Sequence, residues 1–345
     1  MEDYFHFDID YENYTTAENG TDDTVVDPRH SSCFKDINCF ALVIVNIIMF
    51  FLGILGNGIV IWIAGLKMSK TVNTTWYLSL AVSDFMFCTI HPFNIAYMIS
   101  QDWTFGLFMC KFTSFMMFVN MFSSIFLLVV ISVDRSVSVI FPVLAQNQRT
   151  VNKASGVVIL AWVLSLALSI PSIIFRDVQS HIGKSVCFNN YTANPYSHKS
   201  IAVSRFVFGF VIPFIVIIAC YSIIMLKLRN NRMMKSSKPL KVMTALVATF
   251  FICWLPYHFF VLLELNQSHF NKDLLSFGLQ IGTIMATANS FLNPVLYVFM
   301  GNDFRKKFKS SLLSKIENAM AEEGRTTSRY LSRSSSVEGR ASTHI

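Results

Sequence analysis

The chain has 345 residues, of which 53% are hydrophobic and only 14% are charged. Soluble globular proteins carry roughly 25% charged residues, so this composition excludes an ordinary soluble domain and favours a membrane protein. The formal net charge is +7. Attraction of basic loops to anionic lipid explains this charge, and we do not interpret it as a nucleic-acid signal.

The N-terminal segment, residues 1–38, is acidic, with ten Asp and Glu residues against Arg29 and Lys35. Two interpretations stay open: a solvated, unfolded tail, or a charged surface that attracts a basic peptide or protein. The segment carries glycosylation sequons at Asn13 and Asn19. It lacks the apolar segment of a cleavable signal peptide, so we expect the first apolar span to direct membrane insertion.

Seven apolar stretches follow this segment, and each reaches the roughly 20 residues that a helix needs to cross a bilayer. The sequence therefore predicts an all-α membrane protein, a seven-transmembrane helix bundle over residues 39–300. Because seven is odd, the two chain ends are expected on opposite sides of the membrane. The stretches are residues 39–65, 74–100, 107–133, 154–175, 200–226, 240–264 and 274–300.

The loops on one side of the predicted bundle hold ten Lys and Arg residues and no acid. Short cytoplasmic loops are enriched in basic residues, so these loops are predicted to face the cytoplasm and the N-terminus to be extracellular. Two further sequons, at Asn190 and Asn266, then fall in outer loops, where glycosylation is expected. The predicted location is the plasma membrane.

The seven cysteines divide by their position in this topology. Cys110, at the outer end of the third span, and Cys187, in the second outer loop, face an oxidising compartment, so we expect a disulfide between them. Cys33 and Cys39 either pair with each other or stay reduced, and their spacing does not decide between these alternatives. Ordinary packing roles inside spans are predicted for Cys88, Cys220 and Cys253.

Polar side chains inside the spans are costly in lipid, which makes them candidates for function. Asp84 in the second span is accompanied by neutral oxygen donors at matching depth. One carboxylate with several neutral oxygens suits a small hard cation, so allosteric Na⁺ is one interpretation. A protonated Asp84 within a hydrogen-bond network is the other. The possible partners of Asp84 are Asn120, Ser124, Asn289, Ser290 and Asn293.

Three short motifs, one in the middle of a span and two near the cytoplasmic ends, also combine charge or proline with other polar or bulky groups. Asp134-Arg135 ends the third span, either as an anchoring ion pair or as a pair that Arg135 leaves for another partner. Pro256, close to Trp254, and Pro294 each remove a helical hydrogen bond, which predicts hinges in the sixth and seventh spans.

In chain order these motifs resemble those of the rhodopsin-like (class A) G protein-coupled receptors, over nearly all of residues 40–316. Ser136 departs from the pattern, since most members have Tyr there. Ser236 departs as well, because many members have a Glu there that holds Arg135 inactive, and that contact is not expected here. The matching motifs are Gly56-Asn57, Leu80-Ala81-Val82-Ser83-Asp84, Cys110, Asp134-Arg135, Trp162, Pro213 with Tyr221, Cys253-Trp254-Leu255-Pro256 and Asn293-Pro294-Val295-Leu296-Tyr297.

Within that family the chain is most similar to the chemoattractant receptors, above all the chemerin receptor, with formyl peptide receptors as near relatives. The third span has Met117-Phe118 where formyl peptide receptors carry an acid, and Thr287 stands in place of the retinal-binding Lys of opsins. The resembling segments are residues 175–177, 187–190, 204–206, 256–258, 262–265 and 298–304.

The resemblance implies an extracellular peptide or protein ligand of the chemerin type. Arg205, in the outer half of the fifth span, is predicted to hold an anionic end of that ligand. The alternative is that Arg205 pairs with Glu264 or with acids of the loops, and that the surrounding rings are ordinary core. The predicted ligand-binding residues are Arg205, Glu264, Phe115, Phe118, Arg176, Tyr257 and Trp254, with Phe206 and Phe259 as further aromatic neighbours.

On the inner side the resemblance implies coupling to a heterotrimeric G protein, with Gi as the expected class. Residues 301–316 are predicted to form a basic amphipathic helix on the membrane surface, and residues 317–345 a disordered cytoplasmic Ser/Thr-rich tail. Receptor kinases would phosphorylate Ser332, Ser334, Ser335 and Ser336, and the added charge would bind arrestin. The predicted coupling residues are Asp134, Arg135, Tyr221, Asn293, Pro294 and Tyr297.

The sequence therefore predicts a chemoattractant receptor, with no enzymatic motif and no required cofactor beyond possible Na⁺. The alternatives are a receptor of the formyl-peptide or complement type, a scavenger receptor that binds ligand without signalling, and a transporter or channel. The absence of visible repeats disfavours the transporter, and the departure at Ser136 keeps the scavenger interpretation open.

Overall fold

The computed structural model describes residue 33, residues 37–181, 183–192, 196–230 and 238–300, and residues 306 and 310. Within this part of the chain the structure is helical apart from one hairpin, whose strands are β1 (Arg176–His181) and β2 (Lys184–Asn189). The helices are α1 (Ile37–Trp62), α2 (Val72–Ser100), α3 (Gly106–Ile140), α4 (Pro142–Gln148), α5 (Val151–Phe175), α6 (Tyr196–Phe206), α7 (Ile212–Asn230), α8 (Lys238–Glu264) and α9 (Lys272–Met300).

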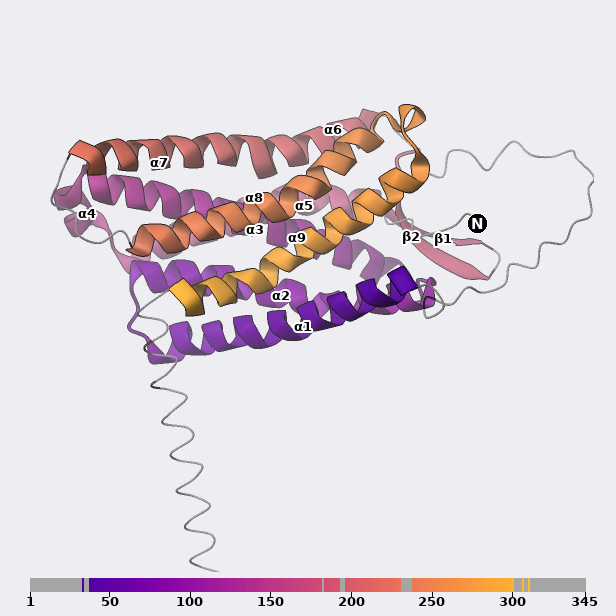
Figure 1. The fold of residues 1–345 in the computed structure, drawn as a ribbon, viewed down its shortest axis with the longest axis horizontal. Coiled ribbons are helices and arrows are strands. Elements are labelled where there is room, and N and C mark those ends of the chain that lie inside the picture. The colour runs from indigo at the N-terminus through magenta and orange to yellow at the C-terminus, as the bar shows by residue number, and fades with distance from the viewer. Residues whose placement is uncertain are drawn as a thin grey trace, which may run out of the picture.

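The long helices lie side by side along one axis, with the hairpin at one end and α4 at the other (Figure 1). Five helical stretches are long and apolar enough to cross a membrane by length and composition, namely Ile37–Lys67, Gly106–Ile140, Val151–Phe175, Tyr196–Lys227 and Val242–Glu264. The helices α2 and α9, each 29 residues long, lie beside them and complete the seven. Polar residues such as Asp84 and Asn289 lower the hydropathy of these two helices, which explains why composition alone does not mark them. With five apolar stretches and these two helices, the predicted seven-helix bundle is confirmed.

The seven helices extend slightly beyond the predicted apolar stretches, most of all at α3. The prediction ended the third span at residue 133, whereas α3 continues to Ile140 and carries Asp134 and Arg135 on its last turns. Hydropathy marks the part of a helix that lies in lipid, not the point where its backbone hydrogen bonds stop, and this explains the difference. The predicted amphipathic helix at 301–316 and the tail fall almost entirely outside the described residues and stay predictions.

Helix α3 supplies the centre of the largest hydrophobic core. Phe118, Met121, Phe122 and Ile125 of α3 are almost fully buried against residues of α2, α7, α8 and α9. Large apolar side chains of the outer helices, such as Ile215 of α7, are instead exposed on the surface of the bundle. Exposed apolar side chains on long helices are what lipid contact requires.

Helices α8 and α9 approach each other closely where glycine replaces a side chain. A Cβ atom added to Gly282 of α9 would lie 2.8 Å from the Cα of Tyr257 on α8. Gly56 of α1 has a similar role against α9, because an added Cβ there would lie 3.0 Å from the ring of Pro294. These contacts fix α9 against both of its neighbours, and α9 lines the cavity described below.

The fifth span contains a change of helical pitch. Between α6 and α7 the chain forms the π-helical turn η3 (Val207–Val211), directly before Pro213. Proline lacks the N–H that would bond to the carbonyl four residues earlier, so a widened turn at this point has a local cause. Arg205 lies on the last turn of α6, directly before this widened turn.

Candidate functional site

The outer end of the bundle is covered by the β1–β2 hairpin, which is attached at several points. A disulfide joins Cys187 of β2 to Cys110 of α3, with 5.7 Å between the Cα atoms. The Ser185 N–H donates to Asp102 (2.8 Å), and the Trp103 N–H donates to the Ser185 carbonyl (2.8 Å). The expected outer disulfide is present, and together these contacts hold the hairpin over the end of the bundle, as a roof. A second disulfide joins Cys33 to Cys39, which settles the alternative that spacing left open.

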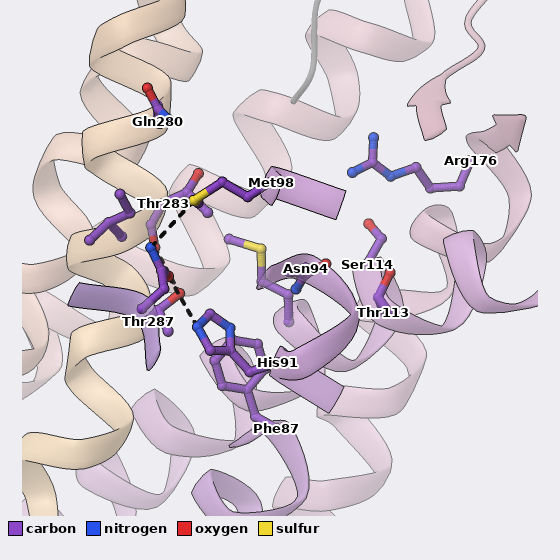
Figure 2. Close-up of a pocket in the computed structure, with 13 residues that line it drawn as sticks. Phe87, His91, Asn94, Met98, Thr113, Ser114, Arg176, Gln280, Thr283 and Thr287 are labelled. Atoms are coloured by element: carbon purple, nitrogen blue, oxygen red, sulfur yellow. Dashed lines mark hydrogen bonds between the residues drawn. The ribbon is translucent and has the colours of Figure 1, made fainter. Parts of the chain in front are cut away.

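A cavity lies under this roof, between α1, α2, α3 and α9 (Figure 2). Of the predicted ligand-binding residues, Arg176 is the one that lines it, reaching in from the first residue of β1. Its walls combine polar and apolar side chains. They are formed by Asn46, Phe87, His91, Asn94, Met98, Thr113, Ser114, Met117, Arg176, Gln280, Thr283, Ile284 and Thr287.

The sequence prediction missed the polar residues of this cavity. His91 is an ionisable residue inside a span, and that signal alone could have marked it, as it marked Asp84. His91 is 4% exposed, and its Nε2 lies 3.1 Å from Oδ1 of Asn46 on α1. Asn94 and Gln280 face the same space from α2 and α9 (Figure 2). Which of these side chains meet depends on helix rotation, which hydropathy does not report.

Arg205 lies on α6 outside this cavity, in a mainly aromatic environment. Its Nη2 donates a hydrogen bond to Ser172 of α5 (2.9 Å), and the guanidinium carbon lies 3.5 Å from the ring centre of Phe118. The Nε atom is buried and has no hydrogen-bond partner among the described residues. No described carboxylate lies within ion-pair distance of Arg205, so the alternative pairing with Glu264 is not seen. The guanidinium is held by one neutral hydrogen bond and a cation–π contact.

The predicted aromatic residues form a continuous cluster below Arg205, with two exceptions. Tyr257 lies 6.3 Å from Phe118 and 5.8 Å from Trp254 between ring centres, and all three rings are buried. Phe115 is only half-buried. Phe259 was expected to contribute, but it is 54% exposed on the outer face of α8, because it lies two positions beyond Tyr257 on the helix.

Two further contacts complete the outer end of the fifth and sixth spans. The predicted residue Glu264 is buried at the end of α8, and its carboxylate lies 4.0 Å from Nε2 of His198 on α6. The His198 ring stacks on Tyr191 with 4.9 Å between ring centres. His258, two turns inward from Glu264 on α8, lies 5.6 Å from the ring of Phe206. Glu264 therefore connects α8 to α6 through His198.

A polar cluster lies midway along the bundle, around Asp84. The carboxylate accepts hydrogen bonds from Asn120 (2.9 Å) on α3 and Asn293 (2.8 Å) on α9. Ser290 donates to the Asn120 amide oxygen (3.1 Å). The Ser124 hydroxyl and the side-chain amide of Asn289 are buried without a hydrogen-bond partner among the described residues. Of the predicted set, Asn120 and Asn293 therefore contact the carboxylate directly, and Ser290 joins them through Asn120.

At the inner end the predicted Asp134 and Arg135 are joined by residues that the sequence prediction did not include. Arg149, in the loop after α4, holds the Asp134 carboxylate with two hydrogen bonds of 2.8 and 3.0 Å. The Nε of Arg135 is 3.8 Å from Asp134, and both arginines donate to the amide oxygen of Asn73 on α2. Asp134 therefore binds Arg149 more closely than its neighbour Arg135.

The other inner residues are placed on three helices. Ser136 donates to the carbonyl of Cys220 on α7 (3.1 Å), so the departure from the family pattern becomes a contact between α3 and α7. Tyr221 packs against the edge of the main core, and Pro294 meets Gly56 of α1. Tyr297 belongs to α9, but its side chain lies outside the described residues.

Of the predicted modification sites, two can be placed. Asn266 is exposed after α8, which suits glycosylation. The amide of Asn190 donates to Asp177 (3.1 Å), and its oxygen accepts from Thr192 (2.7 Å). Both ends of the Asn190 side-chain amide are therefore engaged within the hairpin region. The remaining predicted sites, Asn13, Asn19, Ser332, Ser334, Ser335 and Ser336, lie outside the described residues.

Comparison with known proteins gives a consistent result over most of the chain. Residues 56–297 match the family of 7 transmembrane receptors (rhodopsin family). The chain is 43% identical to chemerin-like receptor 1 of Sus scrofa over 339 residues, covering 91% of this chain and 93% of that protein. It is 46% identical to the Homo sapiens chemerin-like receptor 1 over 300 residues, with coverage of 82% and 80%. Formyl peptide receptor 2 of Mus musculus is 39% identical over 336 residues, with coverage of 92% and 94%.

Proposed function

The chain belongs to the rhodopsin family of seven-transmembrane receptors, and we propose that it binds a chemerin-like peptide or protein outside the cell and activates a Gi-class G protein inside. The family is one of multi-pass plasma-membrane receptors with an extracellular ligand and a G protein partner, and its members are not enzymes. The resemblance stated from the motifs is thereby confirmed. The ligand, the G protein class and the extracellular N-terminus are the parts that we propose.

Arg205 is the observation that carries the ligand proposal. A guanidinium inside a helix bundle is costly unless an anion compensates it, and no described residue supplies that anion. A peptide C-terminal carboxylate can accept two parallel hydrogen bonds from the guanidinium. The aromatic cluster of Phe118, Tyr257 and Trp254 then offers apolar contact for the adjoining residues of the peptide.

The choice of chemerin over formyl peptides rests on similarity and on one position. Identity to chemerin-like receptor 1 reaches 46%, against 39% for formyl peptide receptor 2. Phe118, the ring under Arg205, is part of the Met117-Phe118 pair that stands where formyl peptide receptors carry an acid. An acid there would neutralise Arg205, whereas a ring leaves its charge for the ligand.

We further propose that Na⁺ binds the cluster around Asp84 in the inactive state. The buried Ser124 hydroxyl and the Asn289 amide oxygen, both without partners among the described residues, fit a cation that needs oxygen ligands in addition to a carboxylate. Asp84, Ser124 and Asn289 would hold the ion, which would favour the arrangement of α2, α3 and α9 described above. Desensitisation by receptor kinases and arrestin, acting on the tail, belongs to the same proposal.

A receptor that binds ligand without signalling is the second candidate, and Ser136 favours it. Its hydroxyl bonds to the Cys220 carbonyl and joins α3 to α7 at the inner end. The two candidates differ in one assay. Chemerin added to the purified receptor with a Gi heterotrimer accelerates nucleotide exchange under the main proposal, and binds without doing so under the second. A formylated peptide in the same assay tests the ligand class.

A further inference from the structure

His91 presents a hydrogen-bond acceptor to the cavity between α1, α2, α3 and α9. Its Nε2 is 3.1 Å from Oδ1 of Asn46. The amide nitrogen of Asn46 donates to the Leu42 carbonyl (2.7 Å) and lies 3.9 Å from the Met98 sulfur. Because a carbonyl can only accept, the amide nitrogen of Asn46 must face Leu42, and its oxygen must face His91. The proton of His91 is therefore on Nε2.

The other ring nitrogen then carries a lone pair. In a neutral imidazole with its proton on Nε2, Nδ1 is an acceptor. None of the residues that line the cavity is acidic, so nothing there stabilises an imidazolium. Nδ1 is buried, and no described residue donates to it. Figure 2 shows this nitrogen turned away from the Asn46 bond, toward the side of the cavity where Asn94 lies.

We infer that the His91 end of the cavity binds an uncharged group that carries an N–H or O–H, such as an amide or a hydroxyl at the tip of a ligand. The apolar wall beside His91 is Phe87, whose ring centre lies 6.2 Å from that of His91, and it accepts the apolar part of such a group. A carboxylate would face the lone pair of Nδ1, and an ammonium group would find no lining acid. A polar site of this kind rejects an analogue without the donor, because the buried acceptor then stays unpaired.

This subsite differs in chemistry from the Arg205 site. Arg205 lies on α6 and attracts an anion, whereas His91 lies on α2 and attracts a neutral donor. The inference adds a second subsite to the proposed function. Its application to the natural ligand rests on that proposed function. Its test uses neither peptide nor G protein, so the two can fail separately.

The test uses small fluorinated probes and the full-length receptor in lipid discs. The first pair is para-fluorobenzamide and para-fluoro-N,N-dimethylbenzamide, which differ in the N–H groups. The second pair is para-fluorobenzyl alcohol and its methyl ether, which differ in the O–H group. Fluorine NMR titration, corrected with empty discs, gives the affinity of each probe. The amide pair and the alcohol pair together show which of the two donors the subsite takes.

We expect the donor-bearing probe of at least one pair to bind about tenfold more tightly than its methylated partner. His91→Phe keeps a ring of similar size and should abolish that preference. His258→Phe is the matched control, since His258 is 1% exposed on α8 and does not line the cavity, and it should leave the preference unchanged. Equal affinities within both pairs, or a preference that persists in His91→Phe, would overturn the inference.

A measurement on the unmodified receptor guards against a variant that does not fold. Nitrogen-15 resonances of histidine distinguish a protonated ring nitrogen from one with a lone pair. His91 should show a protonated Nε2 and a lone pair on Nδ1, and the Nδ1 resonance should move when the preferred probe is added. A proton on Nδ1 in the receptor without probe would contradict the inference. Preferential probe binding in a receptor that drives no nucleotide exchange would keep this inference and reject signalling.

Discussion

Single side chains decide what the outer half of this receptor can bind. Arg205 has one hydrogen bond to Ser172 and a contact with the face of Phe118, and no carboxylate partner among the described residues. Both contacts come from helices, Ser172 from α5 and Phe118 from α3, so the position of the guanidinium does not depend on a loop. This missing carboxylate is the reason why we propose that Arg205 binds an anionic group of the ligand.

Replacement of Arg205 by Gln should weaken a peptide with a free C-terminal carboxylate by about 10- to 100-fold, since a hydrogen bond to a charged group contributes roughly 1.5–3 kcal/mol. The amidated form of the same peptide should lose little affinity. Radioligand competition with both forms of a chemerin C-terminal peptide measures the difference. Equal loss for the two forms would show that Arg205 does not bind the carboxylate.

The second prediction for a single side chain concerns Asp84. If Na⁺ binds its carboxylate together with Ser124 and Asn289, agonist affinity should fall as Na⁺ replaces choline at constant ionic strength, because the ion favours the inactive state. Asp84→Asn should remove this dependence, since a neutral amide binds a cation weakly. Agonist affinity that is identical in Na⁺ and choline buffers would reject the sodium proposal.

At the scale of elements, the position of α9 against α8 depends on Gly282. A Cβ at this position would lie 2.8 Å from the backbone of Tyr257, so the helices would have to separate. Gly282→Ala should lower the midpoint of thermal unfolding, with a cost of about 1–3 kcal/mol that is typical of overpacking. It should also weaken agonist binding, because Tyr257 and Thr283 lie on the displaced surfaces.

Gly156→Ala is the matched control for that change. Gly156 is exposed on α5, and nothing lies within 4 Å of an added Cβ. Alanine has the higher helix propensity, so this variant should be unchanged or more stable by up to about 1 kcal/mol. A Gly282→Ala receptor as stable as Gly156→Ala would show that α8 and α9 are not held by this contact.

The hairpin is the other element whose position matters for binding. The disulfide from Cys110 to Cys187 closes a separation of 77 residues and holds β2 on α3. Disulfides typically stabilise by about 2–4 kcal/mol. Cys187→Ser should therefore reduce surface expression and agonist binding, measured by flow cytometry and radioligand. The double variant with Cys110→Ser should match the single one, and a double variant that is clearly worse would mean that the two residues act separately.

For the whole molecule, the number, order and approximate ends of the helices follow from hydropathy, because lipid requires a long apolar run in each span. The outer disulfide also followed from topology. The pairing of Asp134 with Arg149, the cavity around His91 and the exposure of Phe259 did not. The first depends on where the loop after α4 lies, and the other two depend on how a helix is rotated against its neighbours. Single-sequence hydropathy carries no information on loop position, or on rotation in a helix that is apolar on every side.

The same limit explains the inner end. The sequence placed Asp134 and Arg135 at the cytoplasmic edge. Asn73 reaches Arg135, and Arg149 reaches Asp134 and Asn73, only because α2, α3 and the loop after α4 converge there. In this arrangement Arg149 is 2.8 Å from the Asp134 carboxylate, whereas Arg135 is 3.8 Å from it. Arg135 therefore has only a weak contact with Asp134 to break when it moves to another partner. We expect Arg135 to be the residue of this cluster that meets the G protein.

The most direct test of the account is guanine-nucleotide exchange on a purified Gi heterotrimer by the purified receptor in lipid discs, with and without chemerin. The account predicts that chemerin accelerates exchange, and that Arg135→Ala abolishes the acceleration while chemerin binding stays within about twofold of the unmodified receptor, since Arg135 lies at the opposite end of the bundle from the ligand. Chemerin binding without exchange on Gi or any other heterotrimer would contradict the account and leave a receptor that binds its ligand without signalling.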